Sequence, residues 1–232
     1  MTTIREALDV ARRKLAEVGI ETAALDARLL LQYAAGLSHE NIVANSGQPL
    51  GARAAGKLQG LMARREAHEP VSRILGEREF LGRVFRVTPA VLDPRPETEV
   101  LVGEALKQLK PGARVLDIGT GSGAIIVSLL AECPGATGVA TDISQAALEV
   151  ARLNAQRLGV AKRLQWLHCS WFEGVAGRFD LIVSNPPYIP WAAIAALPAS
   201  VRGFDPHWAL DGGPDGLEAY RRLAAGAGGH LA

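Results

Sequence analysis

The chain has 232 residues, of which 48% are hydrophobic and 21% charged, and its formal net charge is +1. This length suffices for one α/β domain and a smaller accessory domain, and no apolar run approaches the roughly 18 residues that cross a membrane. The charge is also spread evenly, since residues 1–70 carry nine Lys or Arg and eight Asp or Glu, which argues against direct nucleic-acid binding because a protein that grips duplex DNA usually carries a basic face.

The N-terminal third has only helical patterns. Apolar residues recur at helical spacing over residues 4–18, 22–35 and 52–67, which predicts a small helical bundle over residues 1–69. The first of these helices is amphipathic and of mixed charge, unlike a signal peptide. We therefore expect a cytoplasmic protein.

A short segment follows the bundle. Residues 71–75 and 80–87 are predicted as two strands around a turn at 76–79, so that residues 70–90 form a β-hairpin linker.

From residue 91 to residue 232 strands and helices alternate. This alternation predicts a doubly wound, Rossmann-like α/β domain with a parallel sheet. The predicted strands lie at residues 114–118, 137–141, 163–168 and 179–184, and the predicted helices at 97–109, 123–132, 144–158 and 216–225.

A glycine-rich turn follows the first of these strands. Its residues are Gly119, Thr120, Gly121, Ser122 and Gly123. Glycines there let a ligand approach bare backbone, and the helix N-terminus favours negative charge. Asp142 ends the next strand, where a carboxylate can accept hydrogen bonds from ribose hydroxyls. The Gly-x-Gly-x-Gly spacing favours S-adenosylmethionine over a dinucleotide, and the alternative is a plain strand-to-helix turn.

A second motif follows the strand at 179–184. It consists of Asn185, Pro186, Pro187 and Tyr188. The Asn185 side-chain oxygen and the Pro186 carbonyl can accept hydrogen bonds from both N–H groups of a planar NH₂, which builds electron density on that nitrogen and aims it at an electrophilic methyl group. The prolines hold the backbone extended, and Tyr188 offers an aromatic face. A glutamine amide and the exocyclic amine of adenine both fit this motif.

Taken together, these motifs resemble those of the release-factor glutamine methyltransferases of the HemK (PrmC) type. The resemblance rests also on residues 92–99 (Leu-Asp-Pro-Arg-Pro-Glu-Thr-Glu), on Trp171-Phe172, and on the stretch from Phe204 to Leu217, and it covers nearly the whole chain. It implies an enzyme that uses S-adenosylmethionine to methylate the side-chain amide nitrogen of the glutamine in the Gly-Gly-Gln motif of peptide chain release factors. It also implies that the helical domain helps to dock the release factor.

The resemblance implies a role for each site residue. The cofactor would be held by Gly119, Thr120, Gly121, Ser122, Gly123, Asp142, Trp171 and Asn185. Catalysis and glutamine binding would fall to Asn185, Pro186, Pro187 and Tyr188, and Arg95 and Glu97 would line the same cleft.

The sequence departs from the family pattern in two places. Cys169 and Ser170 precede Trp171 where such proteins usually carry an acid that contacts the adenine amine. The family's sheet also has two more strands, whereas this chain ends at Ala232 just as its fifth strand begins. We therefore expect a truncated chain with an incomplete sheet on the side of residues 179–184.

Three alternatives stay open at this stage. They are a ribosomal-protein glutamine methyltransferase, a nucleic-acid adenine N6-methyltransferase, and a module that binds cofactor or partner without turnover. Two cysteines and five histidines share no metal-ligand spacing, so we expect no metal. We also expect a monomer.

Overall fold

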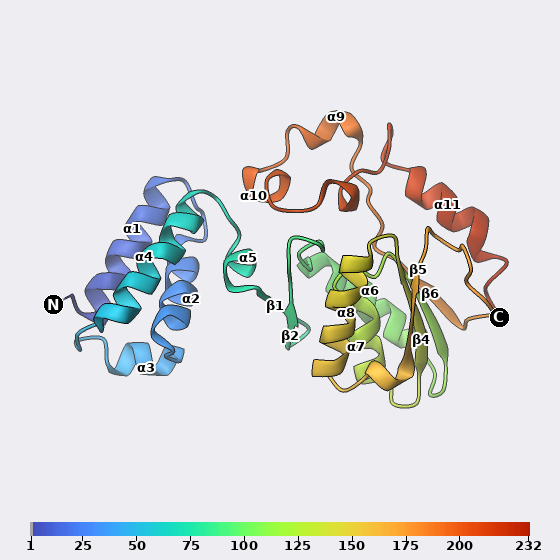
Figure 1. Cartoon of the computed structure of the whole chain (residues 1–232), viewed down its shortest axis with the longest axis horizontal. Coiled ribbons are helices and arrows are strands. Elements are labelled where there is room, and N and C mark those ends of the chain that lie inside the picture. Colours follow the sequence, from blue (N-terminus) through green and yellow to red (C-terminus); the bar gives the residue numbers. More distant parts are fainter. Residues whose placement is uncertain (1) are drawn as a thin grey trace. The chain divides into compact units, whose positions relative to one another are not determined.

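The computed structural model describes residues 2–232 and divides the chain into two compact units. The first ends at Leu75 and the second runs from Gly76 to Ala232; their elements are labelled in Figure 1. None of the helices found in residues 2–232 combines the length and the apolar character that crossing a membrane requires.

The first unit is all helical, which confirms the predicted helical bundle. It contains α1 (Ile4–Glu17), α2 (Ala23–Ala35), α3 (His39–Ala44), α4 (Ala52–Glu66) and α5 (Val71–Leu75). Helix α1 begins with a capping box, because the Thr3 hydroxyl accepts from the Glu6 backbone N–H while the Glu6 carboxylate accepts from the Thr3 N–H. The unit has its own core, in which Leu15, Leu30 and Leu31 are fully buried.

Helix α5 corrects one prediction. Residues 71–75 were expected to form a strand, but they form a helical turn whose Ile74 N–H donates to the Pro70 carbonyl. Val71, Ile74 and Leu75 are spaced as i, i+3 and i+4, and all three pack into the core of the helical unit. Five residues fit the period of a helix as well as that of a strand, and packing against the neighbouring helices decides in favour of the helix.

The predicted hairpin exists, but its turn was placed wrongly: residues 77–79 of the predicted turn form its first strand, and the real turn lies inside the predicted second strand, in the second unit. Strands β1 (Glu77–Phe80) and β2 (Arg83–Arg86) are antiparallel. Leu81 and Gly82 form the two-residue turn, with φ values of 50° and 68°, the left-handed conformation that tight hairpin turns require. Phe80 and Phe85 are buried and meet edge to face.

The second unit is built on a parallel sheet, as predicted. Its strands are β3 (Arg114–Ile118), β4 (Thr137–Asp142), β5 (Leu164–His168) and β6 (Leu181–Val183), and their spatial order is β5-β4-β3-β6. Every neighbouring pair is parallel, so the carboxyl ends of all four strands meet at one edge. The remaining elements are α6 (Pro96–Gln108), α7 (Ala124–Glu132), α8 (Gln145–Arg157), η1 (Ala161–Arg163), α9 (Trp191–Ile194), α10 (Ala199–Arg202), η2 (His207–Ala209) and α11 (Glu218–Ala227).

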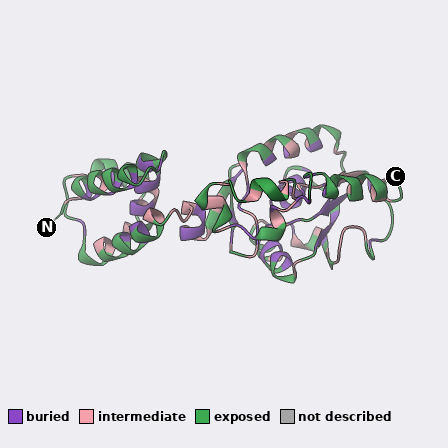
Figure 2. Cartoon of the chain, turned by 90° about the horizontal axis from the view of Figure 1, so that it is seen from above, coloured by how far each residue is buried: buried purple, intermediate pink, exposed green. Residues whose placement is uncertain are grey.

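Both faces of this sheet are covered. Alternate residues of a strand point to opposite faces, and accordingly Val115 packs with apolar residues of α6, α7 and α8, whereas Leu116 and Ile118 pack with Trp171, Phe172 and Leu223. Helices α6, α7 and α8 therefore cover one face, and α11 contributes to the other (Figure 1). Figure 2 shows the buried residues concentrated along the strands and the inner sides of the helices.

Strand β6 has β3 as its neighbour on one side. Just before β6 begins, Phe179 forms an isolated parallel bridge with Leu231. The Phe179 N–H donates to the His230 carbonyl at 2.8 Å, and the Ala232 N–H donates to the Phe179 carbonyl at 3.0 Å. The last residues of the chain thus lie along the side of the sheet on which we expected it to be incomplete.

Candidate functional site

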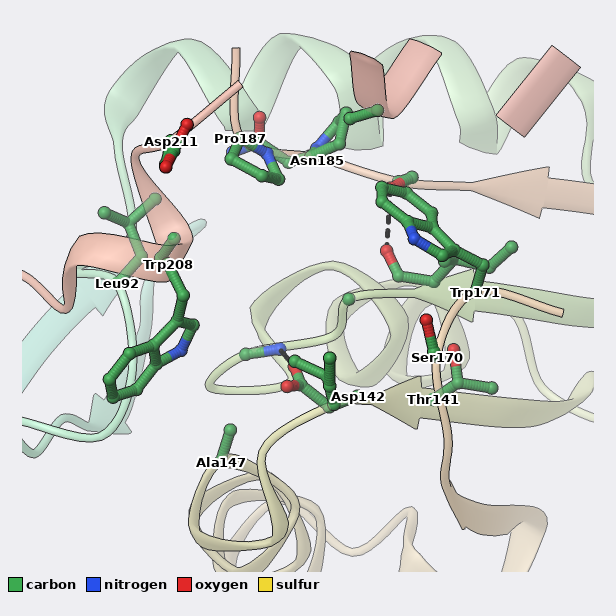
Figure 3. A pocket seen from close by; sticks show the side chains of 18 of the residues that line it. Leu92, Thr141, Asp142, Ala147, Ser170, Trp171, Asn185, Pro187, Trp208 and Asp211 are labelled. Atoms are coloured by element: carbon green, nitrogen blue, oxygen red, sulfur yellow. Dashed lines mark hydrogen bonds between the residues drawn. The ribbon is translucent and has the colours of Figure 1, made fainter. Parts of the chain in front are cut away.

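A pocket of about 480 Å³ opens at the carboxyl edge of the sheet. Each strand supplies lining residues at or just after its end. In spatial order these are Ser170 and Trp171 after β5, Asp142 at the end of β4, Gly119 after β3, and Asn185 after β6. Figure 3 shows the side chains of Ser170, Trp171, Asp142 and Asn185 around the pocket. The fold therefore brings together the glycine-rich turn, the acid and the Asn-Pro-Pro motif, which lie up to 66 residues apart in the sequence.

The glycine-rich turn runs from β3 into α7. Gly119, Gly121 and Gly123 have φ values of 71°, 55° and 81°, which L-residues with side chains seldom adopt. Gly119 and Gly121 line the pocket, and a Cβ built on either meets no atom within 4 Å. Gly123 instead lets two helices approach, because its Cβ would lie 3.1 Å from the Ala151 Cβ in α8.

Three predicted residues of this turn, Gly123 among them, do not line the pocket. Thr120 and Ser122 are buried. The Thr120 hydroxyl donates to Asp117 Oδ2 at 2.7 Å, and the Ser122 carbonyl accepts from the Asn154 side chain at 2.8 Å. These contacts fix the shape of the turn and leave only glycine backbone facing the pocket.

Asp142 is 8% exposed and holds the turn in place. Its Oδ2 accepts from the Gly121 N–H at 2.8 Å and its Oδ1 from the Ser144 N–H at 2.8 Å. Burial raises the pKa of Asp142, and the two backbone N–H groups act in the opposite direction. Because each carboxylate oxygen has a second acceptor direction, Asp142 can bind a pair of hydroxyls and anchor the turn at once.

The Asn-Pro-Pro-Tyr motif follows the end of β6 and lies between two cavities. Asn185 and Pro186 line both the first pocket and a second one of about 400 Å³. Pro187 lines the first pocket only, and Tyr188, which is 54% exposed, lines the second only. The Asn185 side chain is fixed by a hydrogen bond in which its Nδ2 donates to the Thr98 hydroxyl at 3.2 Å. Leu92 and Ala209 also line both cavities, so that Asn185 and Pro186 form part of the wall at which the two cavities meet.

Arg95 and Glu97 both line the second cavity. The Arg95 guanidinium forms an ion pair with Asp205, whose side chain is only 1% exposed, and Asp205 also accepts from the Asp93 N–H. This pair joins the start of α6 to the segment that carries α10 and η2. Arg95 therefore holds two walls of the cavity together. Asp205 lies in the Phe204–Leu217 stretch that carries the family resemblance, but nothing in the sequence predicts its pairing with Arg95.

Trp171 forms another wall of the first pocket. Its φ of 51° lies in the left-handed region, which is costly for a bulky residue and is typical of functional sites. The indole packs against the sheet face of Ile118, and the Arg222 guanidinium lies 6.0 Å above its ring. Ser170, in place of the expected acid, also lines the pocket.

Two tryptophans flank the Asn-Pro-Pro-Tyr motif, and the sequence alone left open whether they form a substrate wall or only pack. Trp191 and Trp208 both line the first pocket, and each is more than half exposed; in Figure 3 the Trp208 and Trp171 side chains lie on opposite sides. Asp211, Glu218 and Arg222, for which the sequence predicted no role, also line this pocket. Within residues 2–232 no three His, Cys, Asp or Glu side chains are grouped so that they could hold a metal ion.

Two family models match the chain. The PrmC N-terminal domain matches residues 6–76, and the methyltransferase small domain matches residues 94–195. The second match covers the glycine-rich turn, Asp142 and the Asn-Pro-Pro-Tyr motif.

Curated relatives match nearly the whole chain. Proteins named release factor glutamine methyltransferase from Cereibacter sphaeroides, Bradyrhizobium diazoefficiens and Agrobacterium fabrum are 51%, 48% and 44% identical. These matches cover 97%, 98% and 99% of this chain, and 81%, 80% and 81% of the relatives. Among solved structures, a SAM-dependent methyltransferase from Thiobacillus denitrificans in complex with S-adenosyl-L-homocysteine is 31% identical over 47% of this chain and 42% of that chain, with a TM-score of 0.34.

Proposed function

Because this chain belongs to the release factor glutamine methyltransferase family, we propose that it methylates the side-chain amide nitrogen of the glutamine in the Gly-Gly-Gln motif of peptide chain release factors. The observation that carries this proposal is the shared wall of Asn185 and Pro186 between the two cavities. A cofactor in one cavity and a planar NH₂ group in the other would meet there.

The first cavity suits S-adenosylmethionine. Asp142 would accept hydrogen bonds from the ribose hydroxyls, the bare backbone of Gly119 and Gly121 would leave room for the methionine part, and Ala147 and Ile143 offer apolar surface. When bound, this cofactor supplies an electrophilic methyl group on a sulfonium. No metal is required for such a transfer.

The chain's own residues act on the amide. An amide nitrogen is a poor nucleophile because its lone pair is delocalised into the carbonyl group. The Asn185 Oδ1 and the Pro186 carbonyl accept one hydrogen bond each from the two N–H bonds of the substrate amide. These hydrogen bonds raise the electron density on the amide nitrogen and orient it. Consecutive prolines fix the backbone so that the carbonyl needs no reorganisation. Tyr188 presents an aromatic face toward the second cavity.

The second cavity would receive the glutamine and its neighbours. It is lined by Leu101, Ile189, Leu197 and Val201 together with the charged Arg95 and Glu97. The match of residues 6–76 to the PrmC N-terminal domain supports a docking role for the helical unit, which ends at Leu75, while the hairpin and the parallel sheet belong to the second unit, the methyltransferase domain. The near-neutral charge of residues 1–70 favours a protein over a nucleic-acid substrate.

The test is transfer of labelled methyl from S-adenosylmethionine to a purified release factor. The matched control is the same factor with its Gly-Gly-Gln glutamine replaced by alanine. We expect label on the first and none on the second. Equal labelling of both factors would contradict the proposed acceptor.

A further inference from the structure

The Asn185 side chain can face the second cavity in two ways. Its amide group has an acceptor end, Oδ1, and a donor end, Nδ2, which exchange places when the terminal torsion rotates by half a turn. Only Oδ1 can accept a hydrogen bond from a substrate NH₂ group. With Nδ2 in its place, two donors would face each other and the acceptor that the chemistry needs would be lost.

The Thr98 hydroxyl tethers the Asn185 amide group in one of these two orientations; a hydroxyl can accept or donate, and here it is the acceptor. It accepts a hydrogen bond from Asn185 Nδ2 at 3.2 Å. Thr98 is 9% exposed and lies in the first turn of α6, whereas Asn185 follows β6, 87 residues further along the chain. With Nδ2 occupied by Thr98, the Oδ1 end stays available to the cavities that Asn185 lines.

The turn that carries Thr98 is itself anchored. Arg95 is the residue before the helix and Pro96 its first residue, which suits a fixed helix start. On one side Arg95 pairs with the buried Asp205, and on the other the Glu99 carboxylate accepts from the Leu81 N–H in the hairpin turn at 3.0 Å. The Thr98 hydroxyl is therefore a fixed reference point for the Asn185 side chain.

We propose that Thr98 is a positioning residue that acts through Asn185, by keeping its Oδ1 directed at the substrate nitrogen. This inference rests on the proposed function, since it deepens the role given there to Asn185. It gives Thr98, which is otherwise only a residue of the first turn of α6, a role in the reaction.

The experiment compares Thr98→Val with Thr98→Ser. Valine keeps the shape of threonine and loses the hydroxyl, whereas serine keeps the hydroxyl. We expect Thr98→Val to lower kcat about tenfold, the order of magnitude of one lost orienting hydrogen bond, and to leave the Kd for S-adenosylhomocysteine unchanged. Thr98→Ser should restore kcat. Ser128→Ala removes a buried hydroxyl in α7 that has no hydrogen-bond partner among residues 2–232, and it should leave kcat unchanged.

A double-mutant cycle separates positioning from a general structural effect. Once Asn185 is replaced by alanine, Thr98 has no side chain to orient, so Thr98→Val should not lower the residual rate further. The inference is overturned if Thr98→Val has wild-type kcat, if Thr98→Ser is as slow as Thr98→Val, or if Thr98→Val costs the same factor in both backgrounds. A fast Asn185→Ala variant would instead overturn the proposed function, and the inference with it.

Discussion

Replacing Asp142 by alanine tests the cofactor site most sharply. In the intact protein its two carboxylate oxygens accept from the N–H groups of Gly121 and Ser144, each at 2.8 Å. The same oxygens are proposed to accept from the two ribose hydroxyls. The variant removes both sets of hydrogen bonds, so it should weaken cofactor binding directly and also release the glycine-rich turn.

The magnitude follows from the charge of the acceptor. A hydrogen bond to a charged group contributes about 1.5–3 kcal/mol, and about 1.4 kcal/mol corresponds to a tenfold change in affinity. We therefore expect Asp142→Ala to bind S-adenosylhomocysteine at least about tenfold to a hundredfold more weakly, which is the loss of one such hydrogen bond. The effect on folding stability is smaller, because removing a buried carboxylate also relieves its desolvation.

The assay is calorimetric titration with S-adenosylhomocysteine, alongside a thermal melt to show that the variant is folded. Asp180→Ala is the matched control. Its carboxylate accepts from the Arg114 N–H at 2.7 Å, at the opposite end of β3 from the pocket, so its loss should leave affinity unchanged. A folded Asp142→Ala variant with wild-type affinity would remove Asp142 from the site and refute the reasoning.

Two further predictions concern the reaction and its pH dependence. Asn185→Ala should lower the single-turnover rate by about 10² while leaving cofactor affinity nearly intact, because one preorganised acceptor is lost; a near wild-type rate would contradict the proposed mechanism. Burial raises the pKa of Asp117 to about 7, well above its value of about 3.9 in an unfolded chain. The folded state therefore keeps a proton that the unfolded state releases, so this contribution to stability is full below about pH 4 and is lost as pH rises through about 7. Urea titrations at several pH values should show this loss in the wild type and not in Asp117→Asn, and an equal pH dependence in both would contradict it.

Sequence reasoning predicted the sheet well because its strands carry strong local signals. The predicted strand at residues 114–118 matches β3, and the predicted strands around β4, β5 and β6 overlap those observed. Strands β3 and β4 are buried almost throughout, as parallel packing covered on both faces requires, whereas the edge strand β5 has exposed residues at Gln165 and His168. The strand predicted at residues 71–75 was wrong, because five residues do not distinguish a helix from a strand until their packing partners are known. The short helices α9 and α10 escaped prediction, since four residues each are too few to show a period.

The same contrast holds in the site. The glycine-rich turn, Asp142 and Asn185 could be predicted because each follows a recognisable strand, and strand ends meet at one edge. The contacts between Thr98 and Asn185 and between Arg95 and Asp205 join residues 87 and 110 positions apart. No local pattern encodes such a pairing. It arises only when the loop after β6 folds back over the start of α6.

The central claim is that the acceptor is the glutamine side chain of a release factor. The most direct measurement incubates the protein and labelled S-adenosylmethionine with a release factor, ribosomal proteins and DNA together, and identifies the methylated atom by mass spectrometry. We predict methyl on the side-chain nitrogen of the glutamine in the Gly-Gly-Gln motif. Methyl recovered on a ribosomal protein or on the exocyclic amine of adenine, with the release factor unmodified, would contradict it.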